Sequence, residues 1–287
     1  MTLVFGSVMV QVAVGGLAFC WVTTRHRVVG IGYGWLLRIT YAVIAFIGVI
    51  SLAGESQGGG ARVVEIVAAV AMILATLVAL AVSVVRRAAG VSGQRAERAR
   101  KLARVAAMVG LTDDEASEPT RGAEFPPVLD LVAPAFGIVA LVAAAAADGG
   151  PYLQSAARYL VGAAFLGAVS DAMLLGHWYL VQPGLSREPV KELVRWTAYV
   201  WPLDVLVWLW PVGMVSVLTG SVKDGWGGLL GWTWQVCAVT TIGLVGVTWA
   251  ALRERYYSAV MAATGLMYLA ILTAFGQDLL ARAVLSQ

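Results

Sequence analysis

Three ionisable side chains, Asp171, His177 and Asp204, fall inside long apolar stretches of this 287-residue chain. A carboxylate in hydrocarbon is costly, so it usually faces the interior of a helix bundle and has a partner there. Counted at 1.5 Å per residue from the predicted helix ends, His177 lies about 7 Å deep, Asp204 about 10 Å and Asp171 about 15 Å. A short connection joins the segments that carry His177 and Asp204, so we expect these two side chains to meet. They predict a quinone or proton site, in which His177 hydrogen-bonds a quinone carbonyl and Asp204 holds or relays its proton.

Aromatic side chains follow His177 in the run 176–183. Trp178 and Tyr179 come directly after it, and together with Gln182 they can line a pocket at one membrane face. The same rings are typical of residues that anchor a helix at the interface. The structural alternative is therefore a neutral or paired Asp that joins two helices, beside an anchoring aromatic run.

Long apolar helices must position these residues. Apolar residues make up 60% of the chain, charged residues only 13%, and the mean hydropathy is +0.80, far from the values of soluble globular proteins. Eight runs are long enough to cross about 30 Å of hydrocarbon, and their continuity predicts helices rather than barrel strands. These runs lie near residues 2–22, 34–53, 63–85, 127–147, 156–181, 197–219, 228–251 and 257–281.

The basic residues predict an orientation. Of the 20 Lys and Arg residues, all but Arg62, Arg158, Lys223 and Arg282 fall in or next to the odd-numbered connections. Because Lys and Arg stay on the cytoplasmic side, both termini are predicted to lie outside the plasma (inner) membrane of a bacterium. The net charge of +3 then describes a rim that faces anionic lipid rather than a nucleic-acid surface.

The longest connection, residues 86–126, is predicted to be cytoplasmic. Its segment 94–109 is basic and helix-prone, and it has a weak apolar stripe. Such a helix can lie on the membrane surface. A solvated linker is the alternative.

A weak internal repeat suggests how the helices are organised. Residues 3–52 align with residues 160–209 at a constant offset, and Trp21/Trp178 and Arg38/Arg195 are the most informative identities. Four spans return the chain to the side on which it started, so the repeat predicts two parallel four-helix bundles. This divides the chain into spans one to three (1–85), the cytoplasmic loop with its basic helix (86–126), span four and an outer loop (127–155) and the second-bundle spans five to eight (156–287).

The repeat also allows the two halves of the chain to be compared position by position. In the first half, the positions equivalent to Asp171, His177 and Asp204 are Val14, Cys20 and Ile47. The paired Trp and Arg residues are then interpreted as scaffold that both halves share. The polar residues that occur only in the second half are the candidates to test for function.

Three functional classes fit these features. The first is a membrane subunit of a respiratory or other electron-transfer complex, with quinone contacted near the cytoplasmic half of spans five and six. The second is a structural or assembly protein without a site of its own. The third is a small-solute or proton-coupled transporter that uses Asp171 and Asp204 as carriers.

The first class is favoured because the two-bundle, eight-span plan resembles the NrfD-like quinol-interacting subunits of respiratory complexes. The resemblance is one of architecture, without a shared motif, and no residue is carried over from that family. It implies partner subunits that bear cofactors, with quinone and lipid as the small molecules to expect. The two histidines and two cysteines form no metal or redox motif, so no metal site is predicted.

Overall fold

The computed structural model describes residues 4–54, 59–109, 122–182, 184–221 and 225–285, and the regular structure within these ranges is entirely helical. Seven helices in this part of the chain are long and apolar enough to cross a membrane, which confirms the prediction of a multi-span helical protein. They are α1 (Phe5–Thr24), α2 (Ile31–Ala53), α3 (Gly59–Val85), α5 (Val132–Ala147) with the short helix η3 (Pro127–Leu131) before it, α6 (Tyr152–Val181), α9 (Leu229–Ala251) and α10 (Tyr257–Leu285).

The predicted sixth span is shifted along the sequence. The apolar run predicts a helix over 197–219, whereas α7 (Glu188–Leu209) begins nine residues earlier and ends ten residues earlier. Pro189 occupies the first turn, where a missing N–H costs nothing, and the helix ends just before Pro211. Its first turns carry Glu188, Lys191, Glu192 and Arg195, so α7 is less apolar than the seven helices above. A six-residue helix, α8 (Gly213–Leu218), follows it.

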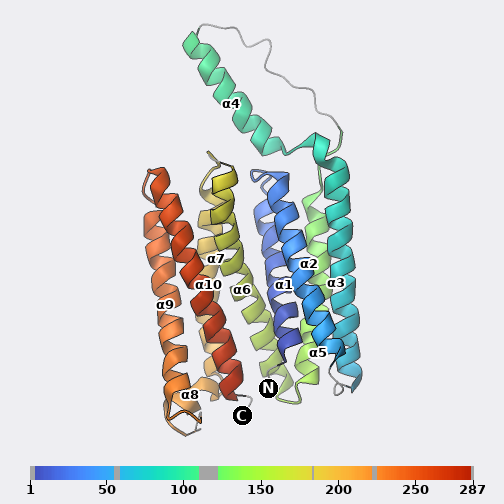
Figure 1. Ribbon diagram of the computed structural model, residues 1–287, viewed down its shortest axis with the longest axis vertical. Helices are drawn as coiled ribbons and strands as arrows, with labels where there is room; N and C mark the ends of the chain where they lie inside the picture. The colour runs from blue at the N-terminus through green and yellow to red at the C-terminus, as the bar shows by residue number, and fades with distance from the viewer. Residues whose placement is uncertain (1–3, 55–58, 110–121, 183, 222–224, 286–287) are drawn as a thin grey trace.

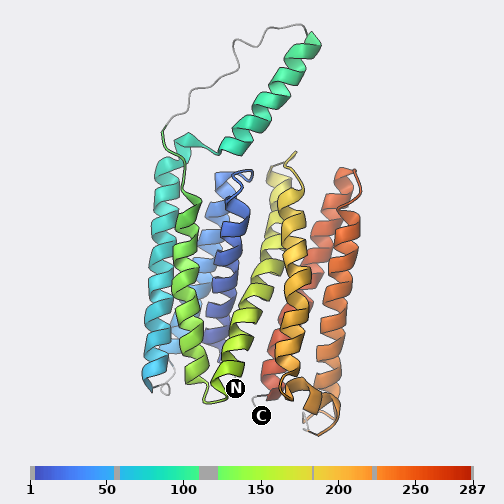
Figure 2. The ribbon, with the colours of Figure 1, turned by 180° about the vertical axis from the view of Figure 1, so that it is seen from behind.

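The long helices stand side by side (Figures 1 and 2), and we describe them as two groups. Helices α1, α2, α3 and α5 contact one another, as do α6, α7, α9 and α10, and α1 packs against α6 where the groups meet. Both termini lie at one end of the assembly, and α4 (Ser92–Val109) lies beyond the other (Figure 1). We call these the terminal end and the α4 end.

Glycines allow α1 and α6 to pack closely at the seam between the groups. A Cβ placed on Gly15 would lie 1.8 Å from the carbonyl oxygen of Ala163, and one on Gly167 would lie 2.2 Å from the carbonyl carbon of Gly15. Small residues permit this kind of backbone approach between membrane helices. The seam therefore fixes which faces of α1 and α6 point toward each other.

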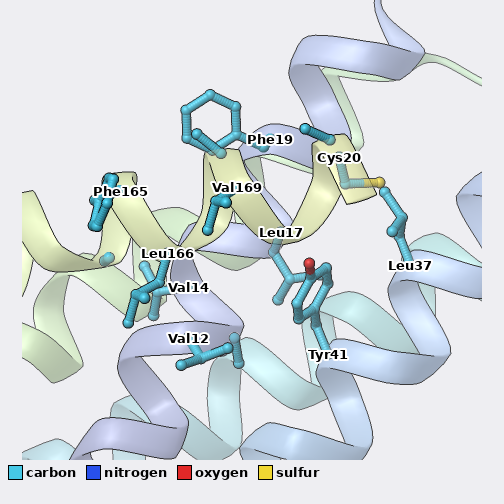
Figure 3. Close-up of a cluster of buried hydrophobic side chains, with 14 of the residues drawn as sticks. Val12, Val14, Leu17, Phe19, Cys20, Leu37, Tyr41, Phe165, Leu166 and Val169 are labelled. Atoms are coloured by element: carbon cyan, nitrogen blue, oxygen red, sulfur yellow. The ribbon is translucent and has the colours of Figure 1, made fainter. Parts of the chain in front are cut away.

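Apolar side chains fill the centre of this seam. Val14 and Leu17 of α1 lie next to Leu166 and Val169 of α6, and Tyr41 reaches into the cluster from α2 (Figure 3). The ring of Tyr41 packs directly on α1, where a Cβ on Gly16 would fall within 2.2 Å of its atoms. Many large apolar side chains on the outer faces are exposed instead, as expected for helices in contact with lipid.

Helix α4 lies within the 86–126 connection, of which residues 110–121 are outside the described part of the chain. Leu102, Val105 and Met108 on this helix are exposed. The start of α4 is tied to the bundle by Glu124, which pairs with Arg27 at 2.8 Å and with Arg95. Helix α4 therefore projects from an anchored base (Figure 1).

Candidate functional site

Asp204 is fully buried near the terminal end of the second group. Helix α7 directs it toward α10, where the side-chain amide of Gln277 donates a hydrogen bond to its Oδ2 at 2.7 Å. Its other oxygen, Oδ1, has no hydrogen-bond partner within the described residues. Asp204 is thus held by a neutral group.

A charged cluster lies beside it, with Arg282 at its centre. The guanidinium of Arg282 donates to Asp278 Oδ2 at 2.7 Å and to Gln11 Oε1 at 2.5 Å, so α10 is joined to α1. The ring centroids of Tyr159 and Trp208 lie 4.7 and 5.5 Å from the guanidinium carbon. Cation–π contacts and an ion pair together make a buried arginine tolerable.

Asp171 is the second carboxyl held by neutral groups. It is fully buried on α6, and the hydroxyl of Tyr41 on α2 donates to its Oδ1 at 2.5 Å. The Ser170 hydroxyl lies 2.8 Å from the same Tyr41 oxygen. Oδ2 of Asp171 has no hydrogen-bond partner in the described structure. Two prominent sequence candidates, Asp171 and Asp204, therefore share one type of environment.

Three other buried carboxylates, those of Asp130, Glu65 and Asp278, carry an arginine partner. Arg38 holds Asp130 through two parallel bonds of 2.8 Å, and Arg62 pairs with Glu65. Asp130 and Glu65 lie near the ends of predicted spans, a position that predicts helix-end groups rather than catalysts. The i,i+3 spacing of Arg62 and Glu65, and the i,i+4 spacing of Asp278 and Arg282, are signals that could have revealed two of these pairs.

The predicted meeting of His177 with Asp204 does not occur. A Cβ on Gly176, next to His177, would lie 2.6 Å from Thr264 Oγ1 of α10, whereas Asp204 lies against Gln277 of the same helix. These two α10 positions are roughly 20 Å apart at 1.5 Å per residue. The cause is the register of α7: because it begins at Glu188, Asp204 lies about 24 Å along it instead of about 10 Å.

The aromatic run around His177 has local partners. His177 itself is exposed. The indole N–H of Trp178 donates to Gln182 at 3.1 Å, and the Tyr179 hydroxyl donates to the carbonyl oxygen of Ser186 at 2.5 Å. These bonds fix the end of α6 and the loop that follows it, and neither of them involves the side chain of Asp171 or Asp204.

The repeat pair Arg38/Arg195 is not equivalent in space. Arg38 is buried against Asp130, whereas the side chain of Arg195 is 47% exposed and lies 4.0 Å from Glu188. The two arginines therefore have different environments. The interpretation of both as scaffold shared by the two halves is wrong for this pair.

Within the described residues, no group of three or more His, Cys, Asp or Glu side chains is arranged to hold a metal ion. Comparison with protein-family models, with curated proteins and with solved structures found no match. The two carboxyls held by neutral groups are therefore the features of this chain that bear most directly on its function.

Proposed function

We propose that this chain is a membrane protein that transfers protons, with Asp204 and Asp171 as the groups that take up and release them. The observation that carries the proposal is the contrast between buried carboxyls. Among the residues that the structure describes, Asp130, Glu65 and Asp278 each have an arginine partner, whereas Asp204 and Asp171 are fully buried, accept hydrogen bonds from neutral donors and each keep one oxygen without a hydrogen-bond partner.

Burial without a counter-ion favours the protonated form of a carboxyl, because an unpaired charge in an apolar interior is costly. A protonated carboxyl without an arginine partner can release its proton, and the resulting carboxylate can take up another, without an ion pair being broken first. The arginine-paired carboxylates lack that freedom and support the helices instead. This division of roles favours proton-coupled transport among the classes that the sequence leaves open.

The spacing of the two carboxyls sets a further requirement. Asp204 is held by Gln277 of α10, and the next residue on that helix is Asp278. Gly162 of α6 lies beside Asp278, since a Cβ placed on Gly162 would be 3.3 Å from Asp278 Oδ1. Asp171 is nine residues farther along α6, roughly 13 Å at 1.5 Å per residue. A proton that crosses this distance needs an intermediate carrier, such as water or a side chain that moves.

The same proposal includes the finer topology. We take α7 as an eighth crossing, which completes two four-helix bundles in parallel repeat and places both termini outside the plasma membrane. Support comes from the basic residues expected on the outer side: Arg62, Arg158 and Arg282 are all buried inside the helix groups, so they do not oppose the positive-inside orientation. Lys223 lies outside the described residues.

Proton flux into liposomes tests the proposal. Purified protein is reconstituted with an internal pH-sensitive dye, and a potassium diffusion potential drives proton entry. Asp204→Asn and Asp171→Asn should each abolish the protein-dependent flux while the proteins stay folded. Glu188→Gln is the matched control, because this carboxyl is 70% exposed and lies in the first turn of α7. Wild-type flux in both Asn variants would refute the assignment.

The electron-transfer subunit with a quinone site at His177 stays a prediction. No contact within the described residues joins His177 to a buried proton-carrying group, so the geometry does not favour this class over proton transfer. Stable co-purification with cofactor-bearing subunits is the measurement that would raise it again.

A further inference from the structure

A groove opens between α7 and α9. Apolar side chains from both helices line it, and its polar members are Arg195, Tyr199 and Trp249. Its apolar lining consists of Val194, Ala198, Ile242, Val245 and the backbone of Gly246.

Glycine gives the groove its depth on the α9 side. A Cβ placed on Gly246 would meet no atom within 4 Å, so the space beside it is open. Tyr199, on the facing helix, is 66% exposed and stands at the margin. An elongated apolar chain therefore fits between α7 and α9.

Two guanidinium groups gather toward the α4 end of the groove. The guanidinium carbons of Arg195 and Arg253 lie 5.7 and 5.8 Å from the ring centroid of Trp249. Arg195 lies 4.0 Å from the carboxylate of Glu188, and that carboxylate also pairs with Lys191 at 3.2 Å. Most of the positive charge at this point is therefore available to an anion.

We propose that this groove is a binding site for an anionic phospholipid, with the phosphate on Arg195 and Arg253 and an acyl chain along the apolar lining. Arginine at the interface suits phosphate, since its fork of N–H donors matches phosphate oxygens. The α4 end is also the end that the positive-inside rule assigns to the cytoplasm, whose leaflet carries anionic lipid. The site is independent of proton transfer through Asp204 and Asp171.

Native mass spectrometry tests the lipid headgroup. The full-length protein in detergent is titrated with dioleoyl phosphatidylglycerol or with dioleoyl phosphatidylcholine, and the lipid-bound fraction is measured. Wild type should bind the anionic lipid more tightly. Each of Arg195→Gln and Arg253→Gln should weaken that binding by roughly fivefold, the contribution expected of one arginine near anionic lipid. Arg104→Gln, on exposed α4, is the control and should leave it unchanged.

Filling the groove tests the acyl-chain position. Gly246→Leu should reduce binding of both lipids, whereas Gly243→Leu should not, because Gly243 also faces open space but is outside the groove lining. Equal affinity of the wild type for the two lipids would overturn the proposal. So would unchanged affinity in both arginine variants, or displacement of phosphatidylglycerol by an equimolar neutral quinone analogue, which would make quinone the occupant.

Discussion

Replacing Arg282 with Met removes the positive charge at the centre of the buried cluster and keeps an unbranched side chain against Tyr159 and Trp208. Arg282 is fully buried, and Asp278 is 1% exposed. Loss of one partner from a buried ion pair costs about 3–5 kcal/mol, because the remaining charge is left without compensation. The oxygen of Gln11 also loses its donor, which adds about 1 kcal/mol or more. We therefore expect Arg282→Met to lower the free energy of unfolding by about 4–6 kcal/mol.

Cys20 offers a reporter for this measurement in a Cys237→Ala background, because the Cys20 thiol is buried and should react with a fluorogenic maleimide only after opening, whereas Cys237 is partly accessible. Denaturant titration in detergent would give the free energy of unfolding for each variant. Lys191→Met is the control: its partner Glu188 is 70% exposed, and exposed pairs contribute about 0–1 kcal/mol. Asp278→Asn combined with Arg282→Met should recover most of the lost stability. A single variant within about 1 kcal/mol of wild type, or a double variant no better than the single, would refute the reasoning.

Two further predictions concern packing and pH. Gly15→Leu should lower the melting temperature, since even a Cβ there would lie 1.8 Å from the Ala163 carbonyl oxygen. Gly243→Ala is the control and should leave the melting temperature unchanged, because a Cβ there meets no atom within 4 Å. Equal melting temperatures for the two variants would contradict the close contact at Gly15. Burial raises the pKa of Asp148, which follows α5, above its usual value, although the Arg282 charge offsets part of that rise. A raised folded-state pKa means that the folded protein binds the proton more tightly, so stability falls as pH rises through the interval between the unfolded and folded pKa values. Asp148→Asn should therefore flatten the decrease in melting temperature between acidic and neutral pH, and an unchanged pH profile would count against a buried, protonatable Asp148.

The apolar helices could be predicted from the sequence because hydrocarbon thickness sets their length. Helix α9 (229–251) coincides with the predicted 228–251, and α6 ends at Val181 as expected. The shift of α7 was not predictable from hydropathy alone, because its first turns are charged and still helical. That shift moved Asp204 away from His177 and so changed the site.

The burial of Asp171 and Asp204 could be predicted from the energetic cost of exposing a carboxyl to hydrocarbon. The side chains that contact these carboxyls could not be predicted. Tyr41 and Gln277 lie 130 and 73 residues away from the carboxyls they contact, and neither forms a recognisable motif with them. The pairing of Arg38 with Asp130 depends likewise on how α2 and η3 pack. Only the tertiary arrangement separates arginine-paired carboxylates from neutral-held ones.

Infrared difference spectroscopy tests most directly whether Asp204 holds an exchangeable proton. Spectra of the reconstituted protein are recorded across a pH titration in H₂O and in D₂O, for the wild type and for Asp204→Asn. The proposal predicts a protonated-carboxyl C=O band in the wild type that shifts in D₂O, changes with pH and is missing from the variant. Identical spectra for the two proteins would contradict it, because Asp204 would then hold no proton that could be transferred.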